Sequence, residues 1–231
     1  MGSLLEIDAF LSQTLKADHG VEEPMGVLKP ALAEVCRFGV VLEPWAGLAE
    51  WVREKKIDAL LIHRPWGLAL DALPEGAGLL VYHRAFDLWL TSPENLCLLQ
   101  AYGLREAQSI TWRDGESIGF VGSIQPIPWS SFLTRITADF DGYDSAGPPT
   151  NEPIRRAAFM GAMNRELVQN ADVLGADVYI TGQVRQPGME AIRQTGMGLV
   201  ATGHRRAELW GLRCLSRLLA QQFPAVQVIN E

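Results

Sequence analysis

The sequence predicts an α/β protein built from two similar lobes. Short apolar runs typical of buried strands alternate with segments of helical periodicity, and both halves repeat a strand–helix–strand–histidine plan. Residues 141–153 are rich in Gly, Pro and Asp and show no periodicity, so we place the boundary there. We therefore expect an N-terminal α/β lobe at residues 1–140 and a C-terminal α/β lobe at residues 141–231, packed as one compact unit.

The composition is that of a globular protein in water: of 231 residues, 48% are hydrophobic and 20% are charged. No apolar run is long enough to cross a bilayer and no signal-peptide pattern is present, so we expect a cytoplasmic protein without membrane contact. The formal net charge of −7 argues against nucleic-acid binding. The three cysteines are far apart, and they indicate neither a disulfide framework nor a thiolate metal site.

The first lobe begins with a capping box at Ser3 and Glu6, which starts a helix ending near Lys16. A strand, a helix and a second strand follow, and this βαβ order predicts parallel strands. Asp114-Gly115 is a favoured two-residue hairpin turn, and Gly103 is a favoured helix end. The expected elements after the first helix are a strand at 35–42, a helix at 45–56, strands at 57–62 and 78–82, a helix at 94–102, a hairpin at 110–121 and a helix at 130–139.

The second lobe repeats the alternation with shorter connections. A long amphipathic segment starts at His204, and its apolar face runs through Leu212, Leu215 and Leu219. The expected elements are a strand at 155–160, a helix at 164–174, a strand at 177–180, a helix at 187–194 ending at Gly196, a strand at 198–203, a helix at 204–222 and a final strand at 226–229.

Three of the four histidines stand where a predicted core strand ends: His63, His83 and His204. Asp87 follows His83 by four residues, and Glu208 follows His204 by four, a spacing that puts both side chains on one helix face. Because ligands collect at the carboxyl ends of strands in α/β sheets, the pattern favours a metal or catalytic site. The alternative is that each histidine is a separate, hydrogen-bonded side chain near the surface.

Neutral imidazole and carboxylate oxygen suit divalent zinc, iron or manganese, and this donor set is enough for one or two ions. A bound divalent ion acidifies water, which would permit hydrolysis, although the sequence assigns no catalytic residue. The phosphate-binding loop, the dinucleotide-binding glycine motif and the serine-hydrolase elbow are all absent from the sequence. Trp66 and Trp89 lie close to the expected ligands and are candidate pocket walls, whereas Tyr82 and Tyr179 are expected to be core residues.

Four motifs resemble those of the Nif-three-like family, whose members are often labelled GTP cyclohydrolase 1 type 2 homologues. They are Leu-Ile-His-Arg-Pro at 61–65, Val-Tyr-His-Arg-Ala-Phe-Asp at 81–87, Gly-Ala-Asp-Val-Tyr-Ile-Thr-Gly at 175–182 and Thr-Gly-His-x-x-x-Glu at 202–208. The resemblance implies two α/β lobes with a dinuclear metal site in the cleft between them and assembly into a homohexamer. It also implies the metal ligands His63, Asp87, His204 and Glu208, with His83 beside them, either supporting a ligand or contacting the ion occasionally.

The chain departs from that family pattern at two places. Arg64 stands where the family has a second histidine, so one ion would lose a ligand. Arg64 could instead bind an anionic group of a substrate, or pair with Asp87 or Glu208. Gln183 and the segment 185–188 replace an acid and a later histidine. We therefore expect a divalent-metal-binding protein, either a hydrolase of a nucleotide-like or other small substrate or a non-catalytic metal-binding or scaffold oligomer. A fold without metal, in which Arg64 replaces a cation, is the third alternative.

Overall fold

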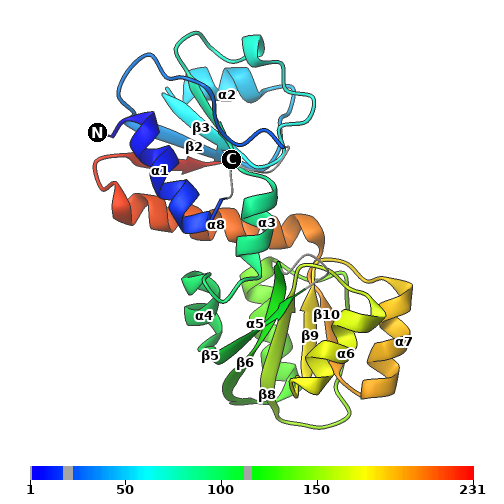
Figure 1. Cartoon of the computed structure of the whole chain (residues 1–231). Coiled ribbons are helices and arrows are strands. Elements are labelled where there is room, and N and C mark those ends of the chain that lie inside the picture. Colours follow the sequence, from blue (N-terminus) through cyan, green and yellow to red (C-terminus); the bar gives the residue numbers. More distant parts are fainter. Residues whose placement is uncertain (1, 18–22, 112–115) are drawn as a thin grey trace. The chain divides into compact units, whose positions relative to one another are not determined.

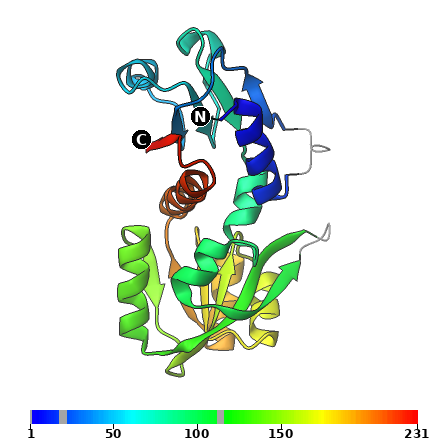
Figure 2. The ribbon, with the colours of Figure 1, turned by 90° about the vertical axis from the view of Figure 1, so that its left-hand side faces the viewer.

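The computed structural model describes residues 2–17, 23–111 and 116–231. The chain divides into two compact units, the first formed by Met1–Phe86 with Gly211–Glu231 and the second by Asp87–Trp210. None of the described helices combines the length and the apolar character that crossing a bilayer requires. Both chain ends lie in the first unit (Figures 1 and 2).

The first unit contains a five-stranded sheet in the order β1-β4-β3-β2-β11. Strands β2, β3, β4 and β11 are parallel to one another, and β1 is an antiparallel edge strand beside β4. The first three parallel strands therefore end at the same edge of the sheet. The strands are β1 (Gly26–Lys29), β2 (Arg37–Val41), β3 (Ala59–Ile62), β4 (Gly78–Val81) and β11 (Gln227–Asn230).

Helices cover both faces of this sheet (Figure 1). On one face, Leu48 and Val52 of α2 (Leu48–Glu54) pack with Leu60 and Ile62 of β3 in one apolar cluster. On the other, α1 (Leu4–Leu15) approaches β4 so closely that a Cβ added at Gly78 would lie 2.7 Å from Leu4 Cδ2. Burial on both faces explains why β3 and β4 are uninterrupted apolar runs.

The second unit contains a six-stranded sheet in the order β5-β6-β8-β9-β10-β7. Strands β8, β9 and β10 are parallel, and β5, β6 and β7 are antiparallel to their neighbours. The strands are β5 (Arg105–Thr111), β6 (Ser117–Ile127), β7 (Ser145–Gly147), β8 (Ile154–Met160), β9 (Val178–Thr181) and β10 (Gly198–Ala201).

The second sheet is also covered on both faces. Helices α6 (Arg165–Val173) and α7 (Gln186–Thr195) share an apolar cluster with β6, β8, β9 and β10. Aromatic contacts mark the opposite face, where Tyr102 of α4 (Leu96–Tyr102) packs against Phe159 and Phe140 of α5 (Trp129–Phe140) packs against Trp210. Two helices, α3 (Arg84–Leu90) and α8 (His204–Gln222), continue from one unit into the other along the chain.

Most expected elements are confirmed. The capping box at Ser3 and Glu6 is present, the long helix begins at His204 as expected, and Leu212, Leu215 and Leu219 are all buried. Gly103 and Gly196 end their helices with positive φ angles of 62° and 74°. Strands β5 and β6 pair as the expected antiparallel hairpin, while its turn residues and His19 lie outside the described part of the chain.

Four elements were not expected, and one of them is a single-turn 3-10 helix at Leu70–Ala72. Strand β1 and helix α3 have no sequence prediction, and β7 lies within residues 141–153, the segment that we expected to separate the lobes. Strand β7 pairs with β10, so this segment is part of the second sheet. Compact units therefore meet along the chain near residues 86 and 210, not at 140, because the final helix and strand return to the first sheet.

Candidate metal centre

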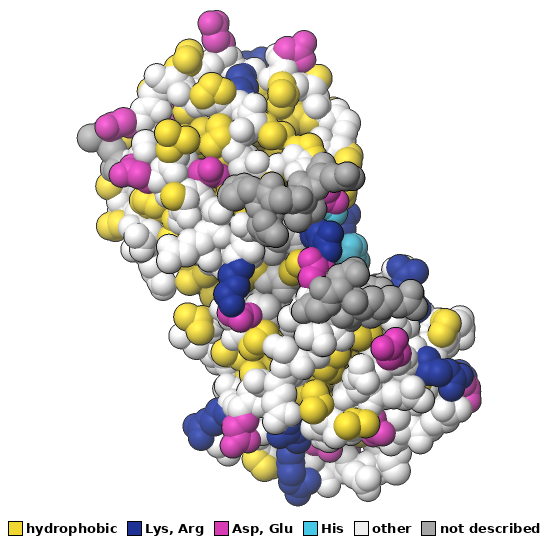
Figure 3. Space-filling view, in the orientation of Figure 1, with side chains coloured by type: hydrophobic (Ala, Val, Ile, Leu, Met, Phe, Trp, Pro, Cys, Tyr) yellow, Lys and Arg dark blue, Asp and Glu magenta, His cyan; other side chains and the backbone are white. Residues whose placement is uncertain are grey.

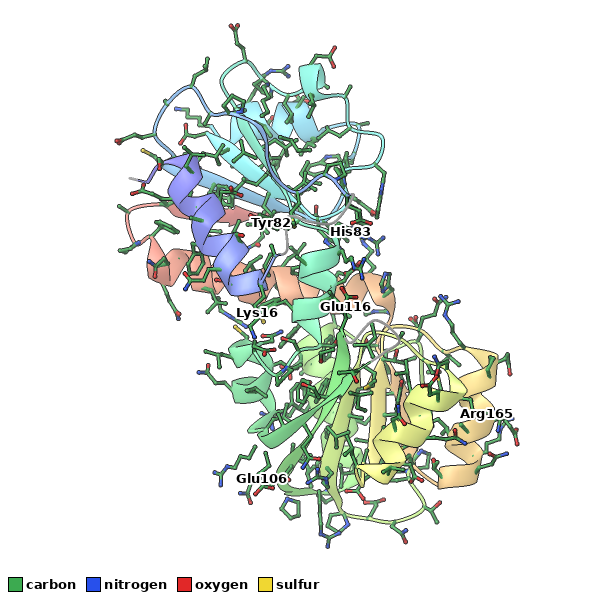
Figure 4. All side chains as sticks on the ribbon, in the orientation of Figure 1. Lys16, Tyr82, His83, Glu106, Glu116 and Arg165 are labelled. Carbon is green, nitrogen blue, oxygen red and sulfur yellow. The ribbon has the colours of Figure 1, made fainter. Side chains whose placement is uncertain are left out.

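His63 and His83 are neighbours because their strands are neighbours. His63 directly follows β3 and His83 lies two residues after β4, and these two strands are parallel. Their ring centroids are 5.1 Å apart, and the His63 ring also packs 4.7 Å from the Phe86 ring. The prediction that strand ends bring these histidines together is therefore confirmed; Figure 4 labels His83 beside Tyr82 at the end of β4.

Asp87 joins the two histidines. It lies in the first turn of α3, four residues after His83, and one ligand atom from each of His63, His83 and Asp87 lies within 4.8 Å of the others. Two donors on one zinc ion lie about 3.4 Å apart, given bond lengths near 2.1 Å and tetrahedral angles. Donor movements of about 1.5 Å or less would suffice, so these residues fit a divalent ion. We refer to them as the His63–His83–Asp87 cluster.

Hydrogen bonds orient both rings of the cluster. His63 Nδ1 lies 3.1 Å from the carbonyl oxygen of Tyr82, and His83 Nδ1 lies 3.0 Å from Glu23 Oε2. A carbonyl oxygen only accepts, so Nδ1 of His63 is the protonated nitrogen, and a carboxylate favours the same state of His83. A partner that orients the ring through one nitrogen is typical of metal-binding histidines.

The His204–Glu208 pair forms the second candidate group. Nε2 of His204 lies 3.4 Å from Oε1 of Glu208, on successive turns of α8, which confirms the expected one-face arrangement. The His204 side chain is 60% exposed, whereas that of Glu208 is 1% exposed. A carboxylate this deeply buried requires positive charge or hydrogen-bond donors beside it.

Gly182, the residue after β9, packs closely against His204. A Cβ added at Gly182 would lie 3.3 Å from both Cα and Nδ1 of His204, so a larger residue would push the histidine aside. Gly182 also borders a small cavity of about 30 Å³, which is lined by Thr181, Thr202 and mostly apolar side chains. The buried hydroxyl of Thr181 faces no hydrogen-bond partner among the described residues.

The remaining predicted site residues have different environments. Arg64 Nη1 lies 3.7 Å from Glu43 Oε2, so its charge is shared with an acid that follows β2. Of the two candidate pocket walls, Trp89 is buried with 3% exposure, which excludes it as a surface wall, and Trp66 is 62% exposed. In Figure 3 histidine side chains reach the surface beside acidic and basic side chains.

Tyr82 and Tyr179 are core residues, as expected. Burial is the first cause that raises the pKa of both phenols above the ordinary value. Tyr82 donates to Asp8 Oδ1 at 2.7 Å, and Tyr179 donates to the carbonyl oxygen of Ala162 at 2.7 Å. Both hydroxyls are therefore committed to structural hydrogen bonds.

Glu23 and Gly182 escaped the sequence reasoning. Glu23 lies 60 residues from His83 along the chain, and no periodic pattern connects them. In the sequence Gly182 is only one residue of a motif. Its role, to leave room for His204, depends on how closely β9 approaches the start of α8.

Known proteins that are similar to this chain belong to the family that the motifs resemble. Residues 45–230 match the family Duf34/NIF3 (NGG1p interacting factor 3). A GTP cyclohydrolase 1 type 2 homologue of Pseudomonas aeruginosa is 27% identical over 145 residues, which make up 63% of this chain and 58% of that protein. Another from Allochromatium vinosum is 23% identical over 193 residues, covering 77% of this chain and 75% of that protein.

The fold is shared with solved structures. The structure of a protein named ybgI, described as of unknown function, superposes with a TM-score of 0.77 at 20% identity and covers 99% of this chain and 97% of its own. With a family match over most of its length and this common two-lobed α/β architecture, the chain belongs to the Duf34/NIF3 family, the Nif-three-like family.

Proposed function

We propose that this protein binds a divalent metal ion, zinc, iron or manganese, and uses it to hydrolyse a small anionic substrate of the nucleotide type. The observation that carries the proposal is the His63–His83–Asp87 cluster, whose ligand atoms lie within 4.8 Å of one another. The names of the curated relatives, GTP cyclohydrolase 1 type 2 homologues, support the substrate class.

The proposed ligands are His63, Asp87, His204 and Glu208, with His83 as a further donor. Tyr82 and Glu23 support this assignment, because their contacts with Nδ1 of His63 and of His83 orient both rings, as the outer partners of metal-binding histidines do. The His204–Glu208 pair supports it as well, because one helix face offers an imidazole nitrogen and a carboxylate oxygen side by side.

A bound divalent cation supplies a nucleophile near neutral pH by lowering the pKa of water. The protein's own residues bind and orient. Asp87 and Glu208 would balance the charge of the ion, and Arg64 would hold an anionic group of the substrate through its guanidinium. A phosphate would have to compete with Glu43 for Arg64, whose Nη1 lies 3.7 Å from Glu43 Oε2.

A non-catalytic metal-binding or scaffold protein is the second candidate. Arg64 favours it, because an arginine paired with Glu43 stands where a second histidine would add a ligand. In that case the ion would stabilise the fold and the protein would catalyse no reaction. For either candidate we propose a homo-oligomer, a hexamer by family resemblance, which sedimentation equilibrium would test by a mass six times that of one chain.

Metal analysis combined with activity separates the candidates. Purified protein, His204→Ala, Glu208→Ala and the surface control Glu190→Ala would be analysed by elemental mass spectrometry and assayed on a panel of nucleotides and phosphoesters. We expect about one or two ions per chain in the wild type and in the control, and a loss of metal and hydrolysis in the other two variants.

The other outcomes decide the alternatives. Bound metal without hydrolysis of any compound in the panel would favour the scaffold candidate. A wild-type protein without metal, purified without chelators and supplied with zinc, iron and manganese in turn, would contradict both candidates.

A further inference from the structure

We propose that Trp66 is a stacking surface for a flat aromatic ring of the substrate, so that the ligand class is an aromatic ring that carries an anionic group. The inference rests on the proposed function, because it names the substrate class of the same site. Three features of Trp66 support it: the exposure of the indole ring, the turn that holds the residue and the contact of the ring with His83.

Trp66 is unusually exposed for a large aromatic side chain. Its exposed fraction is 62%, the largest among the described tryptophans, while Trp89 and Trp210 are 3% and 5% exposed. Leaving most of an indole in water forgoes roughly 2 kcal/mol of burial free energy. Such a surface is well suited to a planar ligand, because stacking on a ring would recover that free energy when the ligand binds.

A hydrogen-bonded turn holds Trp66 in place. Leu68 N–H donates to the carbonyl oxygen of Pro65 at 3.1 Å, and Gly67 has a φ of 79°. These are the features of a type II turn with Trp66 at its second position and glycine at the third, where positive φ is required. The segment before the turn is anchored as well, since Arg64 N–H donates to the carbonyl oxygen of Leu42 at 2.8 Å.

The indole also contacts a residue of the candidate metal centre. The ring centroids of Trp66 and His83 are 4.7 Å apart at an interplanar angle of 77°, an edge-to-face contact. His83 is itself held through Nδ1 by Glu23 at 3.0 Å. The exposed ring of Trp66 is therefore held in direct contact with His83, a member of the His63–His83–Asp87 cluster.

Charge identifies the rest of the ligand. Arg64 precedes Trp66 by two residues, and its side chain is 20% exposed beside a Glu43 side chain that is 44% exposed. A guanidinium binds phosphate or carboxylate in a bidentate manner. A ring stacked on Trp66 with an anion at Arg64 describes a nucleoside monophosphate or a compound of similar shape and charge.

Calorimetry with two probes tests the stacking. Guanosine 5′-monophosphate and ribose 5-phosphate carry the same anionic group and sugar, and only the first has an aromatic ring. We expect the wild type to bind the nucleotide at least about fivefold more tightly, since base–aromatic stacking contributes about 1–3 kcal/mol per base. Trp66→Ala should lose that preference and Trp66→Phe should keep most of it. Trp45→Ala removes another exposed tryptophan, 41% exposed, and should change nothing.

The result that overturns the inference is equal affinity of the wild type for both probes, no binding of either, or a ring preference that survives in Trp66→Ala. Metal content measured on the same samples keeps this failure separate from that of the proposed function. A ring preference that depends on Trp66 in protein without metal would support stacking and contradict the metal proposal. Bound metal without a ring preference would do the reverse.

Discussion

Glu23 and the main-chain carbonyl of Tyr82 each orient the ring of one histidine. Each occupies Nδ1, at 3.0 Å in His83 and 3.1 Å in His63, and so directs Nε2 away from that partner. The two contacts differ in how easily they can be removed, because a main-chain carbonyl survives any substitution of Tyr82. Glu23 is therefore the residue by which the orientation of the cluster can be tested.

Glu23→Ala is expected to lower zinc affinity by about 10–100-fold, because an outer-shell partner fixes the ring orientation and basicity of its histidine. Competition against a fluorescent zinc chelator would measure the affinity. Glu34→Ala, an exposed acid in the same unit, is the matched control and should bind like the wild type. Unchanged affinity in Glu23→Ala would show that His83 is not held for a metal.

Among the elements, the parallel strands place the histidines and the helices place the acids. His63 and His83 follow adjacent parallel strands, so their side chains emerge at one edge of the first sheet. Asp87 and Glu208 lie four residues after a histidine, on α3 and α8, so one helical turn brings each acid next to its imidazole. The βαβ alternation that builds the fold therefore also builds the candidate centre.

The first helix offers a test at the same scale, independent of metal. Ser3 accepts from Glu6 N–H, and Glu6 Oε2 accepts from Ser3 N–H at 2.7 Å, which completes the capping box of α1. Ser3→Ala is expected to lower the free energy of unfolding by about 1 kcal/mol, because a helix donor loses its partner. Urea denaturation at neutral pH would measure it.

Acid should remove part of this stabilisation. The hydrogen bond from the backbone of Ser3, and then that from its hydroxyl, lower the pKa of Glu6 from its ordinary value of 4.5. A lowered pKa in the folded state stabilises the protein above pH 4.5, and that contribution is lost as the pH falls through the lowered pKa. Wild type should therefore lose stability relative to Glu6→Gln as the pH falls below 4.5. A difference that is constant with pH would contradict the capping role of the charge.

For the whole molecule, the proposed ligands come from segments far apart along the chain. His63 and His83 belong to the first unit, and His204 and Glu208 to the second. Because a metal ion would bind only the folded protein, metal binding would add to its stability.

Removing metal is expected to destabilise the protein. At free zinc of 100 times the dissociation constant, binding adds about 2.7 kcal/mol to the free energy of unfolding, so chelation by EDTA should remove about that amount. Thermal unfolding with and without EDTA would measure the shift. Asp87→Asn should unfold at the same temperature in both conditions, and a wild type that does so would contradict the metal proposal.

The sequence by itself determined the α/β class, the capped first helix, the start of the last helix at His204 and the residues of the candidate centre. These follow from local rules, because strand ends, helix caps and four-residue spacing depend only on neighbouring residues. The His204–Glu208 pair is such a case, since a single helix fixes its geometry.

Only the tertiary structure decided the rest. Four features depend on residues that are distant in the chain. They are the return of α8 and β11 to the first sheet, the pairing of β7 with β10, the contact of Glu23 with His83 and the exposure of Trp66. No periodic pattern encodes such contacts, because they arise from strand pairing and packing between elements and from the space left after the cores are filled. Trp66 and Trp89 are both tryptophans near expected ligands, and packing alone buries one and leaves the other in water.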